Sequence, residues 1–369
     1  MFDLIVVGAG PAGASAAISA ARLGAKVMLL DSAIFPRQKV CGEFVSAEAL
    51  ELLDTLLVGS NQALLRDAPR IPRTRIFVDS RKIETSIGSP AASIARIDMD
   101  LTLWHSAEKS GVDARQQTMV RKIEGCGPFH LLTTGGEFEA RAVINTSGRW
   151  SNLNAARDIP ATKSGNSREK WVGIKAHFSE TSPPASVDLY FFEGGYCGVQ
   201  PVNLLGSDLS NGRVNACAMV KASVASTLPD VFTQHPALLE RAQSWQMLTH
   251  PVTTSPLIFG QPQPETGGVL MAGDAAGFVD PFVGDGISLA LRSGRLAAES
   301  LALFFRNQVS LAEAARSYRD VYQQRLSPIF AASSKIRRML TLPKPLRVPM
   351  LMFLEKAPAI TRYMVSKTR

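Results

Sequence analysis

The chain has 369 residues, of which 46% are hydrophobic and 20% charged, which is typical of a folded protein of about two domains and excludes a disordered chain. Lysine and arginine total 40 against 32 acidic residues, but nine basic residues and one acidic residue lie after position 334. The excess of +8 therefore belongs to the C-terminal tail, and the balanced body argues against a nucleic-acid-binding protein.

The four cysteines and five histidines show none of the spacings of a zinc ribbon, an iron–sulfur cluster or a histidine metal site, so we expect no metal. No run of about 18 apolar residues is present, and the first residues lack the pattern of a signal peptide. We therefore expect a cytoplasmic protein with reduced thiols.

The chain begins with a nucleotide-binding pattern. Residues 2–7 form an apolar, β-branched run that predicts a buried parallel strand, and a G-x-G-x-x-G loop follows with Gly8, Gly10 and Gly13. The glycines permit close approach of the backbone to a pyrophosphate. The N-terminus of a following helix stabilises its negative charge.

The elements after this loop complete the pattern. Residues 14–22 are alanine-rich and predict a helix that ends at Gly24, and residues 26–30 predict a second buried strand. Asp31 follows that strand, at the position of the acid that binds a ribose hydroxyl. Strand, glycines, helix and acid in this order predict a dinucleotide site but do not separate FAD from NAD.

A second glycine-rich segment lies near the C-terminal third. An apolar strand over residues 269–272 ends in Gly273 and Asp274. A loop then leads into an Ala/Leu-rich helix over residues 288–305. The residues of this loop that we assign to a cofactor site are Pro281, Gly284, Gly286 and Ile287.

Together these segments resemble the FAD-dependent superfamily that contains aromatic hydroxylases of the p-hydroxybenzoate hydroxylase type, flavin halogenases and geranylgeranyl reductases. The resemblance implies FAD as the cofactor, with Asp274 bound to its ribityl chain. It also implies that the helix after Gly286 points at the pyrimidine edge of the flavin, where a helix N-terminus stabilises the negative charge of the reduced ring.

Residues 35–43 indicate one branch of this superfamily. They resemble the P-x-x-K-x-C-G-E signature of the geranylgeranyl reductases, which here consists of Pro36, Lys39, Cys41, Gly42 and Glu43. The resemblance places Cys41 and Gly42 near the flavin ring and implies that Arg37 contacts a phosphate or ribose of FAD. Cys41 is alternatively an ordinary buried thiol.

Two segments depart from the patterns of the superfamily. Ser147 and Gly148 stand where the hydroxylases have Asp-Gly, which puts an NAD(P)H contact at this point in doubt. Residues 195–201 stand in the place of the reductase motif Y-x-W-x-F-P, of which Tyr196 and Pro201 are present but the Trp and Phe are not. The segment does not match the corresponding halogenase motif either, which disfavours halogenation. Tyr196 either lines the cavity at the ring or is a half-buried strand aromatic.

The spacing of these motifs predicts an α/β fold with a discontinuous Rossmann-type FAD-binding domain, an inserted antiparallel β-sheet substrate domain and a helical C-terminal region. We assign residues 1–70, 93–160 and 265–305 to the first, 71–92 and 161–264 to the second, and 306–369, with the basic tail, to the third.

Two features of this layout have alternative explanations. Lys175 and His177 alternate along a strand, so both point to one face, and we favour solvent or a structural role over a substrate cavity.

The sequence of the C-terminal region predicts a helix over residues 310–338, followed by several prolines among basic and apolar residues. We favour a helical lid there, with peripheral contact to an anionic membrane as the alternative.

The aromatic segment 189–196 indicates an apolar cavity and therefore a hydrophobic substrate that is isoprenoid, lipid-like or polyketide-derived. The leading interpretation is reduction of isolated double bonds, with NAD(P)H or another external donor as reductant and Cys41 or Tyr196 as the catalytic proton donor. The alternative is a monooxygenase that hydroxylates a phenolic or quinone-precursor ring with NAD(P)H and O₂. A flavoprotein that only binds or senses is a third hypothesis.

Overall fold

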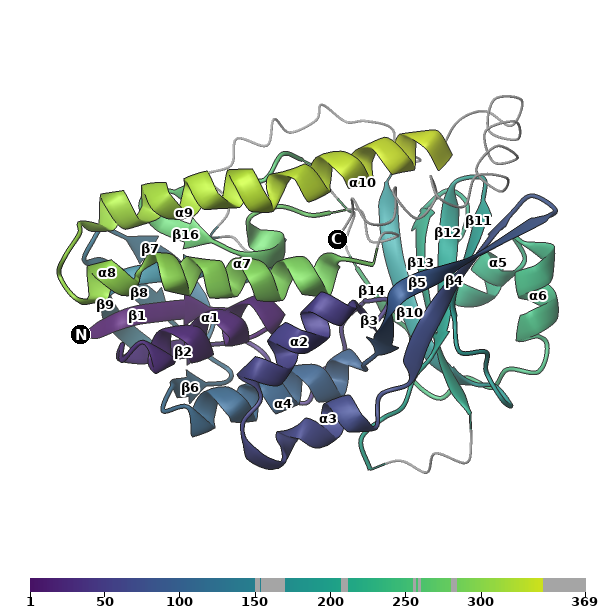
Figure 1. The fold of residues 1–369 in the computed structure, drawn as a ribbon, viewed down its shortest axis with the longest axis horizontal. Helices are drawn as coiled ribbons and strands as arrows, with labels where there is room; N and C mark the ends of the chain where they lie inside the picture. The colour runs from purple at the N-terminus through teal and green to yellow at the C-terminus, as the bar shows by residue number, and fades with distance from the viewer. Residues whose placement is uncertain are drawn as a thin grey trace.

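The computed structural model describes residues 1–149, 153, 170–206, 212–254, 257, 260–279 and 284–340. Two β-sheets lie side by side, and helices cover the first of them (Figure 1). We call the sheet that contains the N-terminal strand sheet A and the other sheet B.

Sheet A has a parallel centre because its strands are apolar on both faces and are covered by helices. The parallel strands run in the order β16 (Val269–Met271), β9 (Gly136–Asn145), β1 (Phe2–Val7), β2 (Val27–Leu30) and β6 (Asp113–Arg115). Antiparallel strands extend it at two places: β15 (Glu265–Thr266) beside β16, and β7 (Val120–Glu124) and β8 (Phe129–Thr133) beside β9.

Helices α1 (Pro11–Arg22) and α7 (Gly286–Ser300) pack very closely, because small residues lie at their crossing. A Cβ on Gly294 would lie 2.0 Å from the carbonyl oxygen of Ala12, and a Cβ on Gly273 would lie 2.9 Å from the Cβ of Ala12. Contact this close admits only glycine. It brings the two glycine-rich segments of the sequence together at one end of sheet A.

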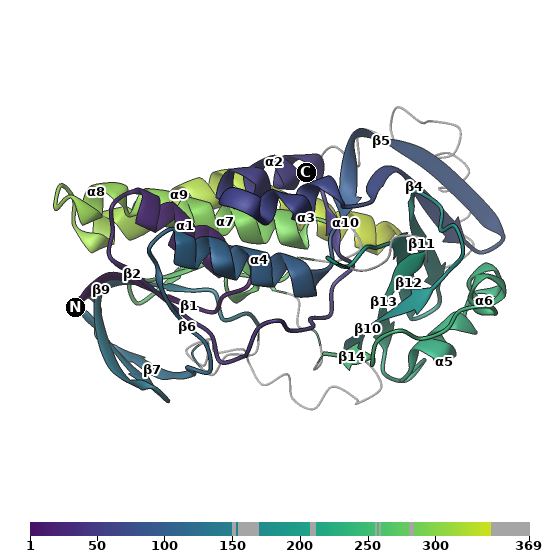
Figure 2. The same cartoon turned by 90° about the horizontal axis from the view of Figure 1, so that it is seen from below.

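Sheet B is an antiparallel sheet with one exception, since β4 and β11 pair in parallel. Its order is β14 (Val252–Thr253), β10 (Trp171–Ser179), β13 (Arg213–Lys221), β12 (Gly195–Pro201), β11 (Val187–Phe192), β4 (Arg70–Val78), β5 (Arg81–Ser93) and β3 (Phe44–Val45). Alternate residues along each strand face opposite sides. One side packs on α5 (Leu228–Phe232) and α6 (Pro236–Ala242), which lie on the outer side of the sheet (Figure 2).

The remaining helices surround sheet A and include α2 (Ala47–Leu56), α3 (Ala63–Arg66), α4 (Arg96–Lys109) and α8 (Ala302–Phe305). Where the sequence predicts one C-terminal helix, the structure has α9 (Leu311–Arg325) and α10 (Ser327–Leu340), divided at Leu326. Ser310 and Glu313 form the capping box that starts α9. The predicted helix over 288–305 is likewise divided, at Leu301.

The predicted fold class is confirmed: a Rossmann-like parallel sheet, a largely antiparallel second sheet and C-terminal helices. Within the described residues, no helix has both the length and the apolar character needed to cross a membrane. The basic tail beyond residue 340, for which we considered a membrane contact, lies outside the described residues.

Candidate active site

A cavity of about 670 Å³ lies between the two sheets. Its walls come from four parts of the chain: the first glycine-rich loop, the segment around Cys41, the segment that begins at Gly273, and the inner face of sheet B. The predicted cofactor residues Gly8, Gly10, Asp31, Arg37, Cys41, Gly42, Gly273, Asp274, Gly284, Gly286 and Ile287 all line it. Pro281 lies outside the described residues.

The first glycine-rich loop has the shape that a pyrophosphate requires. A Cβ on Gly13 would lie 1.7 Å from the carbonyl oxygen of Gly8, so α1 can approach β1 only with glycine there. A Cβ on Gly10, in contrast, would meet nothing nearer than Arg96 Nη2 at 3.9 Å and would project into the cavity. No side chain caps the N-terminus of α1, so its free N–H groups fit a bound phosphate.

Positive charge gathers beside this helix terminus. Arg96 pairs with Asp100 at 2.8 Å, and Arg37 pairs with the same carboxylate at 3.0 Å. Burial and the neighbouring charges of Arg37 and Arg96 lower the pKa of Lys39. These three cations face two carboxylates, those of Asp100 and Asp31, and the remaining positive charge fits the pyrophosphate of a dinucleotide.

Asp31 ends β2 directly beside the loop. Its carboxylate accepts hydrogen bonds from the amides of Ala9 at 2.7 Å and Ala33 at 2.8 Å, and it lies 3.3 Å from Arg37 Nη2. The position is that of the acid at the end of the second strand in dinucleotide folds. Its bond to a ribose hydroxyl, and the predicted contact of Arg37 with FAD, stay predictions.

At the other end of the cofactor region, Asp274 follows β16. Its carboxylate lies 3.4 Å from Arg149 Nε, and the Arg149 guanidinium lies over the ring of Phe278 at 4.0 Å. Helix α7 begins at Gly286 with no side-chain cap, so its N-terminus lines the cavity with free N–H groups. This arrangement fits the ribityl chain and the pyrimidine edge of a flavin.

Cys41 and Gly42 line the cavity where the loop meets sheet B. The Cys41 sulfur accepts a hydrogen bond from the amide of Glu43 at 3.3 Å, and the Cys41 carbonyl accepts one from Asn215 Nδ2 at 3.0 Å. Burial raises the pKa of the Cys41 thiol, although Arg96 partly opposes this effect. A thiol of this kind stays protonated at neutral pH, which suits a proton donor better than a nucleophilic thiolate.

The inner face of sheet B forms an apolar wall. Tyr196 lines the cavity, and its ring centroid lies 5.5 Å from that of Phe191. Leu189, Met219 and Leu257 complete this part of the wall. The expectation that the whole segment 189–196 forms the cavity was wrong for Tyr190, because the strand alternation turns its ring to the other side, against Phe77.

Glu43, which the sequence analysis used only as part of a signature, is the centre of a buried charged cluster. Glu43 Oε1 lies 2.6 Å from Lys175 Nζ, and Glu43 Oε2 lies 2.8 Å from His177 Nε2. Of the two roles that we favoured for Lys175 and His177, exposure to solvent is wrong, since these side chains are 1% and 0% exposed, and the contacts with Glu43 fit the other, a structural role. Burial alone raises the pKa of Glu43, but Lys175 and His177 outweigh it, so the pKa is lowered.

The Ser147–Gly148 segment, which replaces an Asp-Gly pair, also lines the cavity. Asn145 Oδ1 accepts a hydrogen bond from the Ser147 amide at 3.0 Å and so fixes the turn after β9. The carboxylate of the hydroxylase pattern is therefore replaced here by a hydroxyl.

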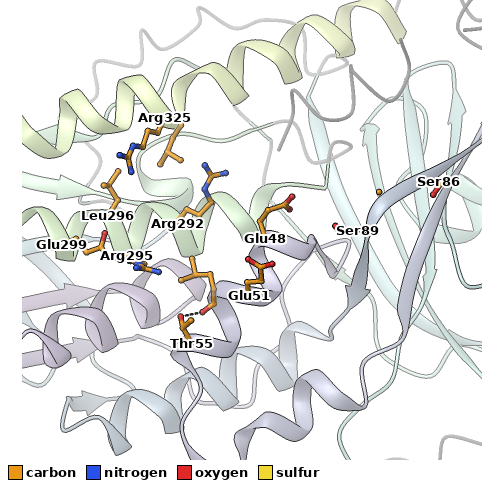
Figure 3. Close-up of a pocket in the computed structure, with 13 residues that line it drawn as sticks. Glu48, Glu51, Thr55, Ser86, Ser89, Arg292, Arg295, Leu296, Glu299 and Arg325 are labelled. Carbon is orange, nitrogen blue, oxygen red and sulfur yellow. Dashed lines mark hydrogen bonds and ion pairs between the residues drawn. The ribbon is translucent and has the colours of Figure 1, made fainter. Parts of the chain in front are cut away.

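A second, larger hollow of about 970 Å³ lies between α2, β5, α7 and α9. Figure 3 shows the glutamates and arginines that border it, among them Glu48, Glu51, Arg292 and Arg325. It contains none of the predicted site residues. In the described part of the chain, no group of His, Cys, Asp or Glu side chains could hold a metal ion.

The fold and the site together define a two-sheet flavoprotein in which a dinucleotide loop and an apolar wall share one cavity. Residues 1–332 match the FAD binding domain family, and the chain belongs to that family. The protein is an FAD-dependent oxidoreductase.

Curated relatives carry the names of reductases. The chain is 30% identical over 318 residues to a geranylgeranyl diphosphate reductase of Rhodobacter capsulatus, which covers 83% of this chain and 76% of the relative. It is 27% identical over 375 residues to a menaquinone reductase of Mycobacterium tuberculosis, covering 93% and 85% of the two chains.

Solved structures share the fold. A geranylgeranyl bacteriochlorophyll reductase-like protein of Thermoplasma acidophilum superimposes with a TM-score of 0.73 at 18% identity, covering 100% of this chain and 95% of the other. A flavin-dependent brominase superimposes with a TM-score of 0.76 at 17% identity, covering 100% and 93%. At these identities the likeness concerns the fold alone.

Proposed function

We propose that this protein reduces isolated carbon–carbon double bonds in the isoprenoid chain of a hydrophobic substrate. The observation that carries the proposal is the single cavity in which the predicted flavin site, the protonated thiol of Cys41 and the apolar wall of sheet B meet. The names of the relatives support it, because geranylgeranyl groups and the side chain of menaquinone are isoprenoid.

The reaction adds a hydride to one alkene carbon and a proton to the other. FAD, when bound and reduced, supplies the hydride and is oxidised, and NAD(P)H or another external donor reduces it again. The Cys41 thiol supplies the proton from Sγ. The resulting thiolate is stabilised by the Glu43 amide, which donates to Sγ, and by the positive charge of Arg96.

The wall of sheet B orients the substrate and excludes water. An alkene has no polar group to anchor it, so its position depends on contact with side chains such as Leu189, Phe191, Tyr196 and Met219. Tyr196 is the second predicted proton donor, and the ring contact with Phe191 holds its side chain against the cavity.

The test uses the purified holoenzyme, reduced with dithionite under anaerobic conditions. The reduced protein is mixed with geranylgeranyl diphosphate, with menaquinone or with a digeranylgeranylglycerophospholipid, and the products are analysed by mass spectrometry. We expect reoxidation of the flavin together with a gain of two hydrogen atoms in at least one substrate. Unchanged substrates, combined with oxygen-dependent hydroxylation of a phenol by the same protein, would overturn the proposal in favour of a monooxygenase.

A further inference from the structure

The buried cluster of Glu43, Lys175 and His177 has no place in the reaction described above. Buried charges cost free energy unless each is paired and hydrogen-bonded, and replacing them with apolar residues is often neutral or stabilising. Such a cluster directly beside a cofactor cavity therefore requires a reason other than stability.

The contacts of Glu43 join the two halves of the molecule. On the sheet A side, its carboxylate accepts a hydrogen bond from the Arg96 amide at 2.9 Å, at the start of α4. Its carbonyl accepts one from the Ile94 amide at 2.9 Å, in the connection between β5 and α4. On the sheet B side, the same carboxylate binds Lys175 and His177 of β10. Glu43 thus connects the start of α4 to the substrate-facing sheet.

The cluster also fixes the backbone that carries Cys41. Glu43 has a φ of 62°, in the left-handed region that residues other than glycine seldom adopt. This conformation turns the Glu43 amide toward the Cys41 sulfur. Lys175 donates a further hydrogen bond to Gln38 Oε1 at 3.0 Å, so β10 holds the segment on both sides of Cys41.

We infer that Glu43, Lys175 and His177 are positioning residues that hold the Cys41–Glu43 segment between the flavin and the substrate wall and balance the charge beside the flavin. The inference rests on the proposed function for its kinetic part only. Its electrostatic part depends on FAD binding in the cavity. Arg37 and Arg96 are paired with the two carboxylates of Asp31 and Asp100, so Glu43 is the counter-ion of Lys175.

The charge balance gives a test that needs no substrate. Glu43→Gln leaves Lys175 without its counter-ion and makes the surroundings of the flavin more positive, while Lys175→Met makes them more negative. Positive charge favours the anionic reduced flavin. We therefore expect the midpoint potential of bound FAD to rise in Glu43→Gln and to fall in Lys175→Met, measured by dithionite titration of each holoenzyme.

Sheet B offers a matched control on its opposite face. Asp188 is fully buried and pairs with Arg75 at 2.6 Å and with Arg241 at 2.5 Å. Asp188→Asn therefore breaks a buried ion pair in the same sheet without contact to the cavity. We expect all three variants to lower the thermal unfolding temperature, and Asp188→Asn to leave the flavin potential and visible spectrum unchanged.

The kinetic arm measures double-bond reduction in the same proteins. We expect Glu43→Gln to lower kcat by about 10²-fold with little change in KM, because misplacing a reacting group by about 1 Å costs about that much. If the wild-type protein reduces no double bond, the proposed function fails, but the potentials still report on the cluster. Potentials that shift in the same direction in both cluster variants, or that equal those of Asp188→Asn, would overturn the inference. If Glu43→Gln does not fold, the direction in which Lys175→Met shifts the midpoint potential of bound FAD decides alone.

Discussion

Two glycines in one loop have opposite structural requirements, and a pair of alanine substitutions separates folding from cofactor binding. A Cβ on Gly13 would lie 1.7 Å from the Gly8 carbonyl oxygen and 2.6 Å from Thr146 Oγ1. Since Cβ atoms essentially never approach closer than 3.0 Å, α1 and β1 must separate by about 1.3 Å. The nearer contact is with the backbone of Gly8, which cannot move aside as a flexible side chain can. The loss of folding free energy should therefore lie at the upper end for overpacking, about 3 kcal/mol.

We therefore expect Gly13→Ala to lower the thermal unfolding temperature of the apoprotein by about 6–12 °C and to yield protein without flavin colour. Gly10 has φ −74° and ψ −174°, which alanine adopts freely, and its Cβ would contact only Arg96 at 3.9 Å. Gly10→Ala should unfold within about 2 °C of the wild type but bind FAD more than about tenfold more weakly, because its methyl group fills the space of the pyrophosphate.

The assays are differential scanning fluorimetry of the apoproteins and flavin absorbance per mole of protein after incubation with FAD. A Gly13→Ala protein that is as yellow and as stable as the wild type would refute the packing argument. A Gly10→Ala protein with unchanged FAD affinity would refute the placement of the pyrophosphate at the N-terminus of α1.

Three further changes test other parts of the molecule. Asp274→Ala should weaken FAD binding by about 10- to 150-fold, since a ribityl hydrogen bond to a carboxylate is worth about 1.5–3 kcal/mol; calorimetry that finds equal affinities would contradict its ribityl role. Cys41→Ala should slow double-bond reduction by about 10²-fold or more and leave dithionite reduction of the flavin unchanged. Because the pKa of Cys41 is raised, the wild-type rate should be constant through neutral pH and fall only in the alkaline range, where the thiol ionises. Burial lowers the pKa of His235, and Asp79 partly opposes this effect. As the pH drops, the unfolded chain takes up the proton before the folded protein does, so the free energy of unfolding should fall as pH drops through about 6.5. It is measured by urea unfolding at a series of pH values, and a His235→Gln protein whose free energy of unfolding falls as steeply with pH as that of the wild type would exclude this residue as the cause.

The sequence alone predicts those parts of the site that are local. Each cofactor motif is a strand followed by a turn and a helix, so the order of residue types defines Gly13 in its loop and Asp274 after its strand. The predicted helix over residues 14–22 and its end at Gly24 follow from the same local signals; in the structure the helix begins three residues earlier, at Pro11, and Gly24 has a positive φ of 87°.

The parts that the sequence does not predict depend on long-range pairing. Strand alternation shows that Lys175 and His177 share a face, but not which face. The answer depends on Glu43, which pairs with Lys175 but lies 132 positions from it in the chain. The parallel pairing of β4 with β11 is likewise a long-range contact. The division at Leu326, in contrast, has a local signal, because Pro328 follows it and cannot continue the helix of α9.

The two faces of sheet B have different surroundings. The outer face packs against α5 and α6, so its residues are constrained by the core. The inner face lines the cavity, where Leu189, Tyr196 and Met219 belong to a small cluster that is separate from the outer core. The ion pair of Glu43 with Lys175 of β10 holds the Cys41–Glu43 segment at a fixed place relative to the inner face of sheet B. Substitutions in the wall should therefore alter which substrate is reduced, whereas substitutions in the cluster should alter how fast any substrate is reduced.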